Sequence, residues 1–389
     1  MTTSETSGVR HLLVTNDFPP KIGGIQSYLW ELWRRLEPEG VAVYTTPYAD
    51  TAAFDAAAPF PIERSPEPVI GPYPWLVDRI NRAAAAHRAQ LVVLDPAVPL
   101  GAIGPQLELP YAVVLHGAEV TIPGRLPGSR ALLRRTLLGA RLVIAAGGYP
   151  AAEAERCAGR PLPTVIVPPG VDHQRFMPLT SEERLAARTE FGLEPDALVV
   201  ASVNRLVGRK GIDVLIHAAA ELARDPVIGA RLRVLIGGRG RLEGALARQI
   251  EATGAPVTLL GRVSDAAVAR LYGAADLMAM LCHDRWFGLE QEGFGIVFLE
   301  AAATGIPQVA GRSGGAHEAV EHDVTGVVLD EPRSVPAVVE VVRALLSDDE
   351  QRVVMGSAAR ARAVQDFDYD LLARRLQGAL TAAVHGTTT

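Results

Sequence analysis

Short apolar runs alternate with amphipathic segments along the first part of the chain. Residues 11–15 read HLLVT, and similar runs lie at 41–45, 91–94 and 110–115. Between them, segments such as 25–36 carry apolar residues at intervals of three and four, the spacing of a helix with one buried face. Runs that are apolar throughout indicate strands buried on both faces. The pattern therefore predicts strands and helices that alternate around a parallel sheet.

The same alternation starts again after a break at 168–172, which reads PPGVD. Apolar runs follow at 197–203 and 232–236, and each leads through glycine or polar residues into a helical segment. Two such blocks predict an α/β protein with two doubly wound, Rossmann-like parallel-sheet domains and right-handed connections. We place the N-terminal domain at 1–168, the C-terminal domain at 169–369, and a terminal helix that returns to the first domain at 370–389.

Composition and charge narrow the functional classes. The chain has 389 residues, 48% of them hydrophobic, a formal net charge of −6, and only two cysteines, Cys157 and Cys282. Residues 1–168 hold 15 basic and 15 acidic residues, so residues 169–389, with 23 and 29, carry the whole net charge. This distribution argues against binding to nucleic acid through charge. Two cysteines without metal-ligand spacing fit a reducing cytoplasm.

Several common kinds of site and segment are not expected. No G-x-x-x-x-G-K-[ST] phosphate loop occurs, and 238–243 (GRGRLE) lacks the third glycine of the dinucleotide fingerprint. The acidic cluster 366–370 (DFDYD) is interpreted as a helix start, so no metal site is expected. The N-terminus lacks a signal pattern and no run of about 18 apolar residues occurs, so we expect a cytoplasmic protein that is soluble or lies at a membrane surface.

The first candidate site is the turn that follows the strand 11–15. Residues 16–24 read NDFPPKIGG, and the helical spacing begins directly after them. A strand, a glycine turn and a helix N-terminus together can bind a phosphate-sized anion at Gly23 and Gly24, with Asp17 beside them as an acceptor-binding candidate. A tight turn that simply requires glycine explains these residues equally well.

Two further candidate positions follow apolar strands. His116 comes directly after 110–115, and Arg205 and Lys210 follow 197–203. Ligands of open α/β sheets bind beyond the carboxyl ends of the strands, which favours functional roles for all three residues. A single histidine at a strand end is as often structural, and two cations in a turn can also form a solvated basic loop.

The segment 292–300 (EGFGIVFLE) is the feature around which we expect the second domain to be organised. Glu292 and Glu300 stand eight residues apart, with Gly293 and Gly295 just after the first. We expect a loop that presents Glu292, followed by a helix whose first turn carries Glu300, where the helix dipole favours a carboxylate. The glycines would let main-chain N–H groups approach an anion or a sugar. Two ordinary surface acids explain the spacing equally well.

Three arginines fall on one side of the helix predicted over 129–142. At about 100° per residue, Arg130, Arg134 and Arg141 lie within roughly 40° of one another, beside an apolar arc. The simpler interpretation, which we favour, is a buried apolar face with a solvated basic edge. The alternative is a basic stripe that faces an anionic membrane surface, where each basic residue contributes about 1 kcal/mol.

These features occur together and in a fixed order along the chain: the glycine pair 23–24, then Arg205 with Lys210, then Glu292 with Glu300. In this combination the chain resembles the retaining glycosyltransferases of family four. That resemblance implies the GT-B fold, in which two Rossmann-like domains face each other across a cleft.

Several stretches are similar, more narrowly, to the actinobacterial phosphatidylinositol mannoside α-1,6-mannosyltransferases: residues 16–28, 126–130 and 292–315. The chain departs from their pattern at 314–318, where the family usually has a proline before the glutamate. It also departs at 282–291, where the family loop is richer in glycine.

The resemblance implies a nucleotide diphosphate sugar bound mostly by the second domain. In this picture Arg205 and Lys210 stabilise the leaving diphosphate, amides near Gly24 add further donors to it, and His116 lies over the sugar. Retention then proceeds by front-face attack without a metal or other cofactor, and the leaving phosphate oxygen takes the proton of the acceptor. The other donor contacts that the resemblance implies are Glu292 with the amides of Phe294, Gly295 and Ile296 for the sugar, Glu300 for the ribose, and Val263 for the base.

The implied function is transfer of mannose from GDP-mannose to a phosphatidylinositol mannoside in α-1,6 linkage. The implied protein is a monomer or weak dimer with weak peripheral contact at the inner face of the plasma membrane. A transferase that uses UDP-glucose or a similar donor on a soluble or natural-product acceptor stays open. A nucleotide-sugar epimerase or binder on the same fold also stays open, although two cations beside two glutamates suit a leaving group and argue against it.

Overall fold

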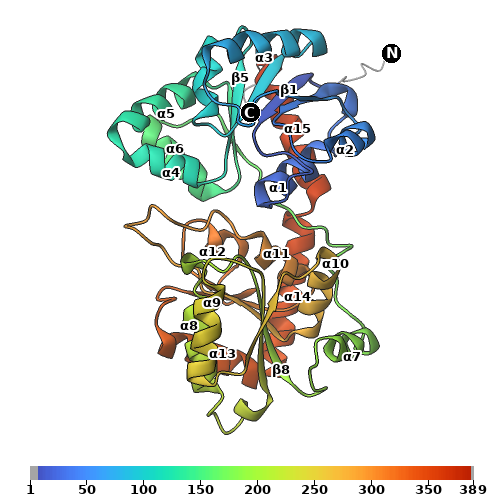
Figure 1. Ribbon diagram of the computed structural model, residues 1–389, viewed down its shortest axis with the longest axis vertical. Helices are drawn as coiled ribbons and strands as arrows, with labels where there is room; N and C mark the ends of the chain where they lie inside the picture. The colour runs from blue at the N-terminus through green and yellow to red at the C-terminus, as the bar shows by residue number, and fades with distance from the viewer. Residues whose placement is uncertain (1–7, 387–389) are drawn as a thin grey trace. The chain divides into compact units, whose positions relative to one another are not determined.

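The computed structural model describes residues 8–386, which form two compact units. Unit 1 takes the described residues up to Pro169 together with those from Tyr369 onwards, and unit 2 takes Gly170–Asp368. Each unit is built around one parallel sheet with helices on both faces (Figure 1). This arrangement confirms the predicted fold class.

Unit 1 contains a seven-stranded sheet in the order β3-β2-β1-β4-β5-β6-β7, and its strand pairs are parallel. Strands β1, β2, β4 and β5 are buried along their whole length, which explains why the sequence shows continuous apolar runs there instead of alternation. The strands are β1 (His11–Thr15), β2 (Val41–Thr45), β3 (Ile62–Arg64), β4 (Leu91–Asp95), β5 (Tyr111–Leu115), β6 (Leu142–Ala145) and β7 (Thr164–Ile166).

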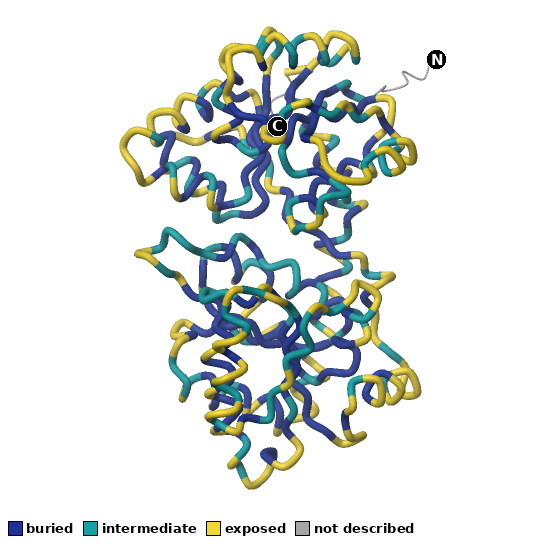
Figure 2. The backbone as a smooth tube through the Cα atoms, in the orientation of Figure 1, coloured by how far each residue is buried: buried dark blue, intermediate teal, exposed yellow. Residues whose placement is uncertain are grey.

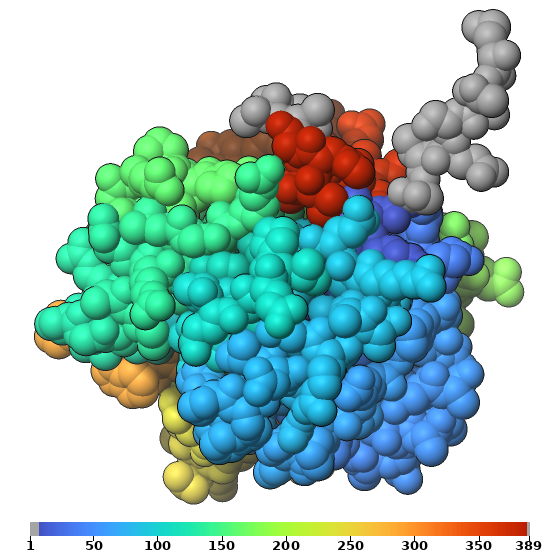
Figure 3. Space-filling view, turned by 90° about the horizontal axis from the view of Figure 1, so that it is seen from above, coloured from blue at the N-terminus to red at the C-terminus, as the bar shows by residue number. Residues whose placement is uncertain are grey.

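The last helix of the described chain packs in unit 1. Leu372 and Leu376 of this helix, α15, share a hydrophobic core with Leu29 and Trp33 of α1. In the space-filling view the red end of α15 lies among blue and green atoms of the N-terminal part of the chain (Figure 3). The helices of unit 1 are α1 (Gly24–Trp33), α2 (Thr51–Ala57), α3 (Pro74–His87), α4 (Ala118–Arg125), α5 (Pro127–Gly139), α6 (Gly148–Ala158) and α15 (Tyr369–His385), with 3₁₀ turns at Pro38–Gly40 and Leu100–Gln106.

Unit 2 contains a six-stranded sheet in the order β10-β9-β8-β11-β12-β13, again with parallel pairs. Five of its strands are mostly buried and form the centre of the unit, whereas the edge strand β10 is partly exposed (Figure 2). The strands are β8 (Leu198–Val203), β9 (Leu232–Gly237), β10 (Val257–Gly261), β11 (Leu277–Met280), β12 (Gln308–Gly311) and β13 (Gly326–Leu329). The helices are α7 (Ser181–Glu190), α8 (Ile212–Leu222), α9 (Glu243–Thr253), α10 (Asp265–Ala274), α11 (Ile296–Ala303), α12 (Ala316–Ala319), α13 (Val335–Ser347) and α14 (Asp349–Asp366), with 3₁₀ turns at Gly208–Lys210 and Gly229–Arg231.

The strand order identifies where each unit can bind a ligand. Chain order reverses between β1 and β4 in unit 1, and between β8 and β11 in unit 2. In open parallel sheets, a crevice forms at the carboxyl ends of the strands at this reversal. The segments that follow β1, β4, β8 and β11 are therefore the places to look for functional side chains.

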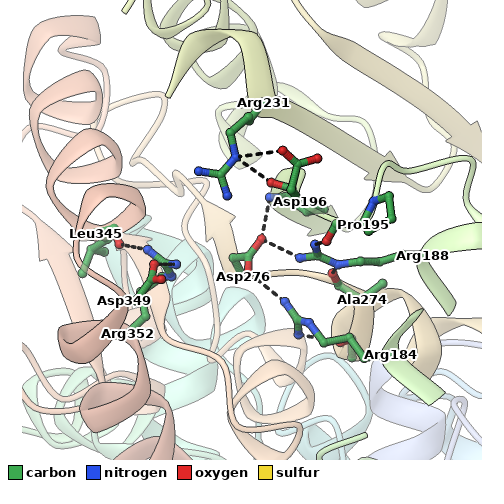
Figure 4. Close-up of polar contacts among 12 residues, drawn as sticks. Arg184, Arg188, Pro195, Asp196, Arg231, Ala274, Asp276, Leu345, Asp349 and Arg352 are labelled. Atoms are coloured by element: carbon green, nitrogen blue, oxygen red, sulfur yellow. Dashed lines mark hydrogen bonds and ion pairs between the residues drawn. The ribbon is translucent and has the colours of Figure 1, made fainter. Parts of the chain in front are cut away.

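A partly buried cluster of charges holds α7 against the sheet of unit 2. The Asp276 carboxylate lies between the guanidinium groups of Arg184 and Arg188, at 2.7 and 3.0 Å, and also accepts the main-chain N–H of Val199 at 2.8 Å (Figure 4). Asp276 precedes β11, so this cluster lies at the amino edge of the sheet. We assign this cluster a structural role, because it lies away from the carboxyl edge and the Asp276 carboxylate is already paired with two arginines. Removing one of these partners would destabilise the fold of unit 2.

Two predicted boundaries are wrong. The helix expected over 129–142 ends at Gly139, because the chain then enters buried strand β6 and the Arg141 N–H donates to the Tyr111 carbonyl at 2.7 Å. The acidic cluster 366–370 is not one helix start: Asp366 ends α14, and only Asp370 lies in the first turn of α15.

Candidate active site

The loop after β8 carries cations into the carboxyl edge of unit 2. Lys210 ends the 3₁₀ turn Gly208–Lys210, and only 7% of it is exposed. Its Nζ lies 2.7 Å from Oε2 of Glu292, and Nε of Arg209 lies 3.5 Å from the same oxygen. Arg205 is exposed and forms no ion pair among the described residues. The structure thus brings Lys210, Arg209 and Glu292 together, and Arg205 lies near enough for its charge to lower the pKa of Glu292.

The backbone around Glu292 is fixed by the segment that follows β12. The Glu292 N–H donates to Oγ of Ser313 at 3.1 Å, and its carbonyl accepts the N–H of Gly315 at 2.9 Å. A Cβ on Gly314 would lie 2.2 Å from the Glu292 carbonyl oxygen. Glycine at position 314 therefore allows two backbone segments to approach closely, and this contact holds the carboxylate in place.

Glu292 is an ionised carboxylate inside the protein. Burial raises its pKa, but the Lys210 ammonium and the guanidiniums of Arg209 and Arg205 lower it more, so the pKa ends below its usual value. The neighbouring Cys282 thiol is fully buried, and burial raises its pKa to about 12. Because a nucleophilic cysteine must be a thiolate, Cys282 is a packing residue.

A glycine at the end of this loop immediately precedes helix α11. Gly295 caps it with a φ of 86°, a conformation that favours glycine, and no side chain within residues 8–386 caps the first N–H groups. Ile296 is the first helical residue. The Phe294 side chain before it is buried, and the centroids of the Phe294 and Phe367 rings are 5.7 Å apart. The uncapped amide N–H groups from Ile296 onwards can donate hydrogen bonds to an anion or a sugar oxygen.

The prediction that Glu300 lies in the first helical turn is wrong. The apolar residues from Ile296 onwards form that turn themselves, so Glu300 lies in the second turn. Its half-buried carboxylate has no hydrogen-bond or ion-pair partner within residues 8–386. Burial raises its pKa to about 7, although Arg175 opposes this shift and Asp265 adds to it. A carboxylate with unused acceptor capacity at this edge is available to a ligand hydroxyl.

Val263 lies in the loop after β10 and packs at the same edge of the sheet. A Cβ on Gly237, the last residue of β9, would lie 2.7 Å from its Cγ2 atom. The structure therefore places Val263 beside the ends of β9 and β10, close to the strand-order reversal of unit 2.

In unit 1, the glycine turn is closed by its own side chains. Gly23 caps α1 and Gly24 is its first residue, as predicted. The Asp17 carboxylate accepts hydrogen bonds from Nζ of Lys21 at 2.8 Å and from Nε2 of Gln26 at 2.6 Å. The turn is thus a rigid, charged loop in which Asp17 already has two donors.

His116 belongs to a buried hydrogen-bonded chain that connects three strands. Its Nε2 lies 2.7 Å from Oδ1 of Asp95, and Oδ2 of Asp95 accepts Oγ1–H of Thr15 at 2.6 Å. Thr15 and Asp95 end β1 and β4 directly opposite each other. Burial lowers the pKa of His116, but the negative charges of Asp95, Glu119 and Asp17 raise it by more than burial lowers it, so the pKa ends above its usual value.

The sequence interpretation missed Asp95, Thr15 and Arg209. For the first two, the available signal was a polar residue at the end of an otherwise apolar strand, the same signal that identified His116. Arg209 stands between a glycine and Lys210, and its cationic side chain was overlooked beside two stronger candidates.

Comparisons with known proteins decide the family. A family described as "Glycosyltransferase Family 4" matches residues 22–175, and one described as "Glycosyl transferases group 1" matches residues 183–362. The chain is 38% identical to a GDP-mannose-dependent alpha-(1-6)-phosphatidylinositol monomannoside mannosyltransferase of Mycobacterium tuberculosis, over 94% of this chain and 97% of that relative. The chain belongs to this glycosyltransferase family.

Two further similarities agree with that assignment. A mannosyltransferase of Corynebacterium glutamicum, named for monoacylated alpha-(1-6)-phosphatidylinositol monomannoside, is 35% identical over 95% of this chain and 97% of its own length. The crystal structure of Anabaena Alr3699/HepE in complex with UDP has a TM-score of 0.80 at 23% identity, and the match covers 96% of this chain and all of that one. The latter similarity concerns the fold.

The basic stripe predicted for this glycosyltransferase is smaller than expected. Arg130 and Arg134 lie exposed on α5, but Arg141 lies beyond the helix and donates to the Ala383 carbonyl at 2.9 Å. Arg134 also donates to a main-chain carbonyl, that of Ala158, at 3.2 Å. No helix in the described part of the chain has the length and apolarity needed to cross a membrane.

Proposed function

We propose that this glycosyltransferase transfers mannose from GDP-mannose to a phosphatidylinositol mannoside, in α-1,6 linkage and without a metal. The observation that carries the proposal is the 38% identity over nearly the whole chain to a mannosyltransferase named for that donor and acceptor. Unit 2 binds most of the donor in this proposal, and unit 1 binds the acceptor.

The cations after β8 bind the donor diphosphate. As the glycosidic bond stretches, negative charge grows on the leaving phosphate oxygen, and fixed cations lower the energy of that state. Arg205 is exposed and unpaired among the described residues, so its guanidinium can chelate phosphate oxygens in a bidentate way. Lys210 is positioned by Glu292 at 2.7 Å, and Nε of Arg209 is buried without a hydrogen-bond partner in the described part of the chain. Three cations supply positive charge that a divalent metal would otherwise provide.

The carboxylates and amides beside these cations bind the sugar and the nucleoside. Among the described residues, the contacts of the Glu292 carboxylate to Lys210, Arg209 and Cys282 all involve Oε2, which leaves Oε1 to accept a sugar hydroxyl. The amides of Phe294, Gly295 and Ile296 add donors to the same sugar. Glu300 accepts from the ribose hydroxyls, and Val263 contacts the base.

The lipid part of the acceptor requires contact with a membrane surface. Arg130 and Arg134 are exposed on α5, and the exposed side chains of Leu126 and Leu132 lie at the same helix, so charge and apolar surface occur together there. Two basic residues contribute about 2 kcal/mol toward an anionic surface, which is enough for reversible docking. We therefore propose peripheral binding at the inner face of the plasma membrane.

A thermal-shift measurement with GDP and UDP tests the donor. Binding to the folded state alone stabilises it by about 2.7 kcal/mol at a ligand concentration 100 times Kd. We expect GDP to raise the Tm of the wild type and to lose this effect in Arg205→Gln. Arg231→Gln is the matched control, because Arg231 lies before β9 and pairs with Asp196, away from the carboxyl edge (Figure 4). Protection by UDP and not by GDP would instead support a UDP-sugar transferase.

A further inference from the structure

Asp95 is a buried carboxylate that the proposed reaction does not otherwise use. Its side chain is 1% exposed and it ends β4 at the strand-order reversal of unit 1. One oxygen accepts from Thr15 at 2.6 Å, and the other lies 2.7 Å from Nε2 of His116. No cation lies against it other than the imidazole, so the imidazole is its only counter-charge among the described residues.

The contact with Asp95 determines which nitrogen of His116 can meet a ligand. A carboxylate accepts hydrogen bonds and cannot donate, so Nε2 must carry a proton. Nδ1 has no hydrogen-bond partner within residues 8–386, and the imidazole is 12% exposed. The edge of the Tyr28 ring packs against the imidazole, with centroids 5.4 Å apart and planes at 86°, and restrains its rotation. Nδ1 is therefore the ring nitrogen that remains available to a ligand.

We propose that Asp95 is a positioning residue for glycosyl transfer: it fixes the Nε2–H form and the orientation of His116, so that Nδ1 contacts a hydroxyl of the reacting sugar. This inference rests on the proposed function, with the sugar over His116 as the family resemblance implies. Asp95 itself does not touch the ligand, because both of its oxygens are occupied and its side chain is buried.

Burial lowers the pKa of His116, but the acidic groups around it raise the pKa more, which favours the imidazolium. In the imidazolium Nδ1 also carries a proton and donates, whereas in the neutral Nε2–H form it accepts. Three acidic groups face the ring: Asp95 at the end of β4, Glu119 in the first turn of α4, and Asp17 in the turn after β1, itself paired with Lys21. The main-chain N–H groups of His116 and Gly117 both donate to Glu119. Loss of the Asp95 charge would remove the nearest of these groups and make the imidazolium easier to deprotonate.

A purely structural role for Asp95 makes different predictions. The Thr15–Asp95 hydrogen bond joins β1 to β4, so any replacement of Asp95 can destabilise unit 1 without touching catalysis. Measurements that separate the two roles are the protonation state of His116 and the pH profile of kcat, because loss of stability alone moves neither.

The test uses nitrogen-15 NMR of the full chain and turnover measured across pH. In the wild type we expect the neutral form of His116 to carry its proton on Nε2. Asp95→Asn keeps the shape of the side chain and one acceptor oxygen. In this variant we expect the alkaline limb of the kcat profile to move to lower pH. We also expect kcat to fall about 100-fold, the scale of a misplaced catalytic group, with a smaller change in KM. Asp276→Asn is the control, since it removes a partly buried, ion-paired carboxylate from the amino edge of unit 2 and should leave the His116 signals and the pH profile unchanged (Figure 4).

Two results would overturn the inference. One is a wild-type His116 whose neutral form carries its proton on Nδ1, a result that needs no variant and stands even if Asp95→Asn does not fold. The other is a folded Asp95→Asn enzyme with unchanged kcat and pH profile. The NMR result does not depend on any donor, so failure of the proposed GDP-mannose activity would be recognised separately.

Discussion

Replacing Lys210 with methionine removes one half of a buried ion pair. Lys210 and Glu292 are 7% and 9% exposed, and Nζ lies 2.7 Å from Oε2. Breaking a buried ion pair costs about 3–5 kcal/mol, and we expect the lower end of that range because Arg209 still lies 3.5 Å from the same carboxylate oxygen. In a unit of this size each 1 kcal/mol shifts Tm by about 2–4 °C, so Lys210→Met should unfold about 10 °C below the wild type.

The double variant Lys210→Met with Glu292→Gln separates stability from catalysis. It replaces the ion pair with two neutral side chains of similar size, and such replacements are often nearly neutral for stability. Its Tm should therefore return close to that of the wild type. Its kcat should stay about 10²-fold or more below the wild type, because the cation that faces the leaving phosphate is still missing.

The assay is a pair of measurements on the two single variants and the double variant: thermal unfolding, and turnover at saturating nucleotide sugar. Stability losses of the single variants that simply add in the double variant would refute the coupling between the two side chains. Near-normal turnover in Lys210→Met would remove Lys210 from the mechanism, whatever its effect on stability.

Three further predictions concern pH, metal and membrane. Burial raises the pKa of Glu300 to about 7, so between pH 4.5 and 7 the folded state holds a proton that the unfolded state has released, and the free energy of unfolding falls as pH rises through this range. Glu300→Gln should therefore raise Tm at about pH 8, with a gain in unfolding free energy of at most about 3 kcal/mol, and change Tm little at about pH 4. Activity should survive exhaustive treatment with EDTA, and loss of turnover that magnesium or manganese restores would contradict the metal-free proposal. The double variant Arg130→Ser with Arg134→Ser should show less salt-sensitive co-sedimentation with phosphatidylinositol vesicles than the wild type. The control, Arg82→Ser with Arg88→Ser, replaces two other exposed arginines and should not reduce it; equal loss in both variants would mean a general charge effect.

Apolar patterning was sufficient to predict the fold. Buried strands such as β4 and β5 consist almost entirely of apolar residues, and helices such as α1 show one apolar face, so both the type and the order of these elements follow from local physics. The errors occurred where tertiary contacts override the local pattern. The helix that carries Arg134 ends early because the following residues pair in the sheet, and α11 starts early because Gly295 can adopt the left-handed conformation.

The site was only partly predictable for a different reason. Arg205 and Lys210 were identified because they follow a recognisable strand, and Glu292 because two glycines and a helical segment follow it. The pairing of Asp95 with His116 depends on the register of neighbouring strands, and a single sequence does not contain that information. The high pKa of Glu300 depends on burial that exists only after α11 packs against the rest of unit 2.

The central claim is most directly tested by the product of a transfer reaction. The purified chain is incubated with GDP-mannose and vesicles that contain phosphatidylinositol monomannoside, and the lipid is analysed by mass spectrometry and by digestion with linkage-specific mannosidases. The account predicts a lipid heavier by one hexose that an α-1,6-specific enzyme removes, formed by the wild type and by Arg231→Gln but not by Arg205→Gln. An unmodified lipid under these conditions, together with turnover of UDP-glucose on a soluble acceptor, would contradict it.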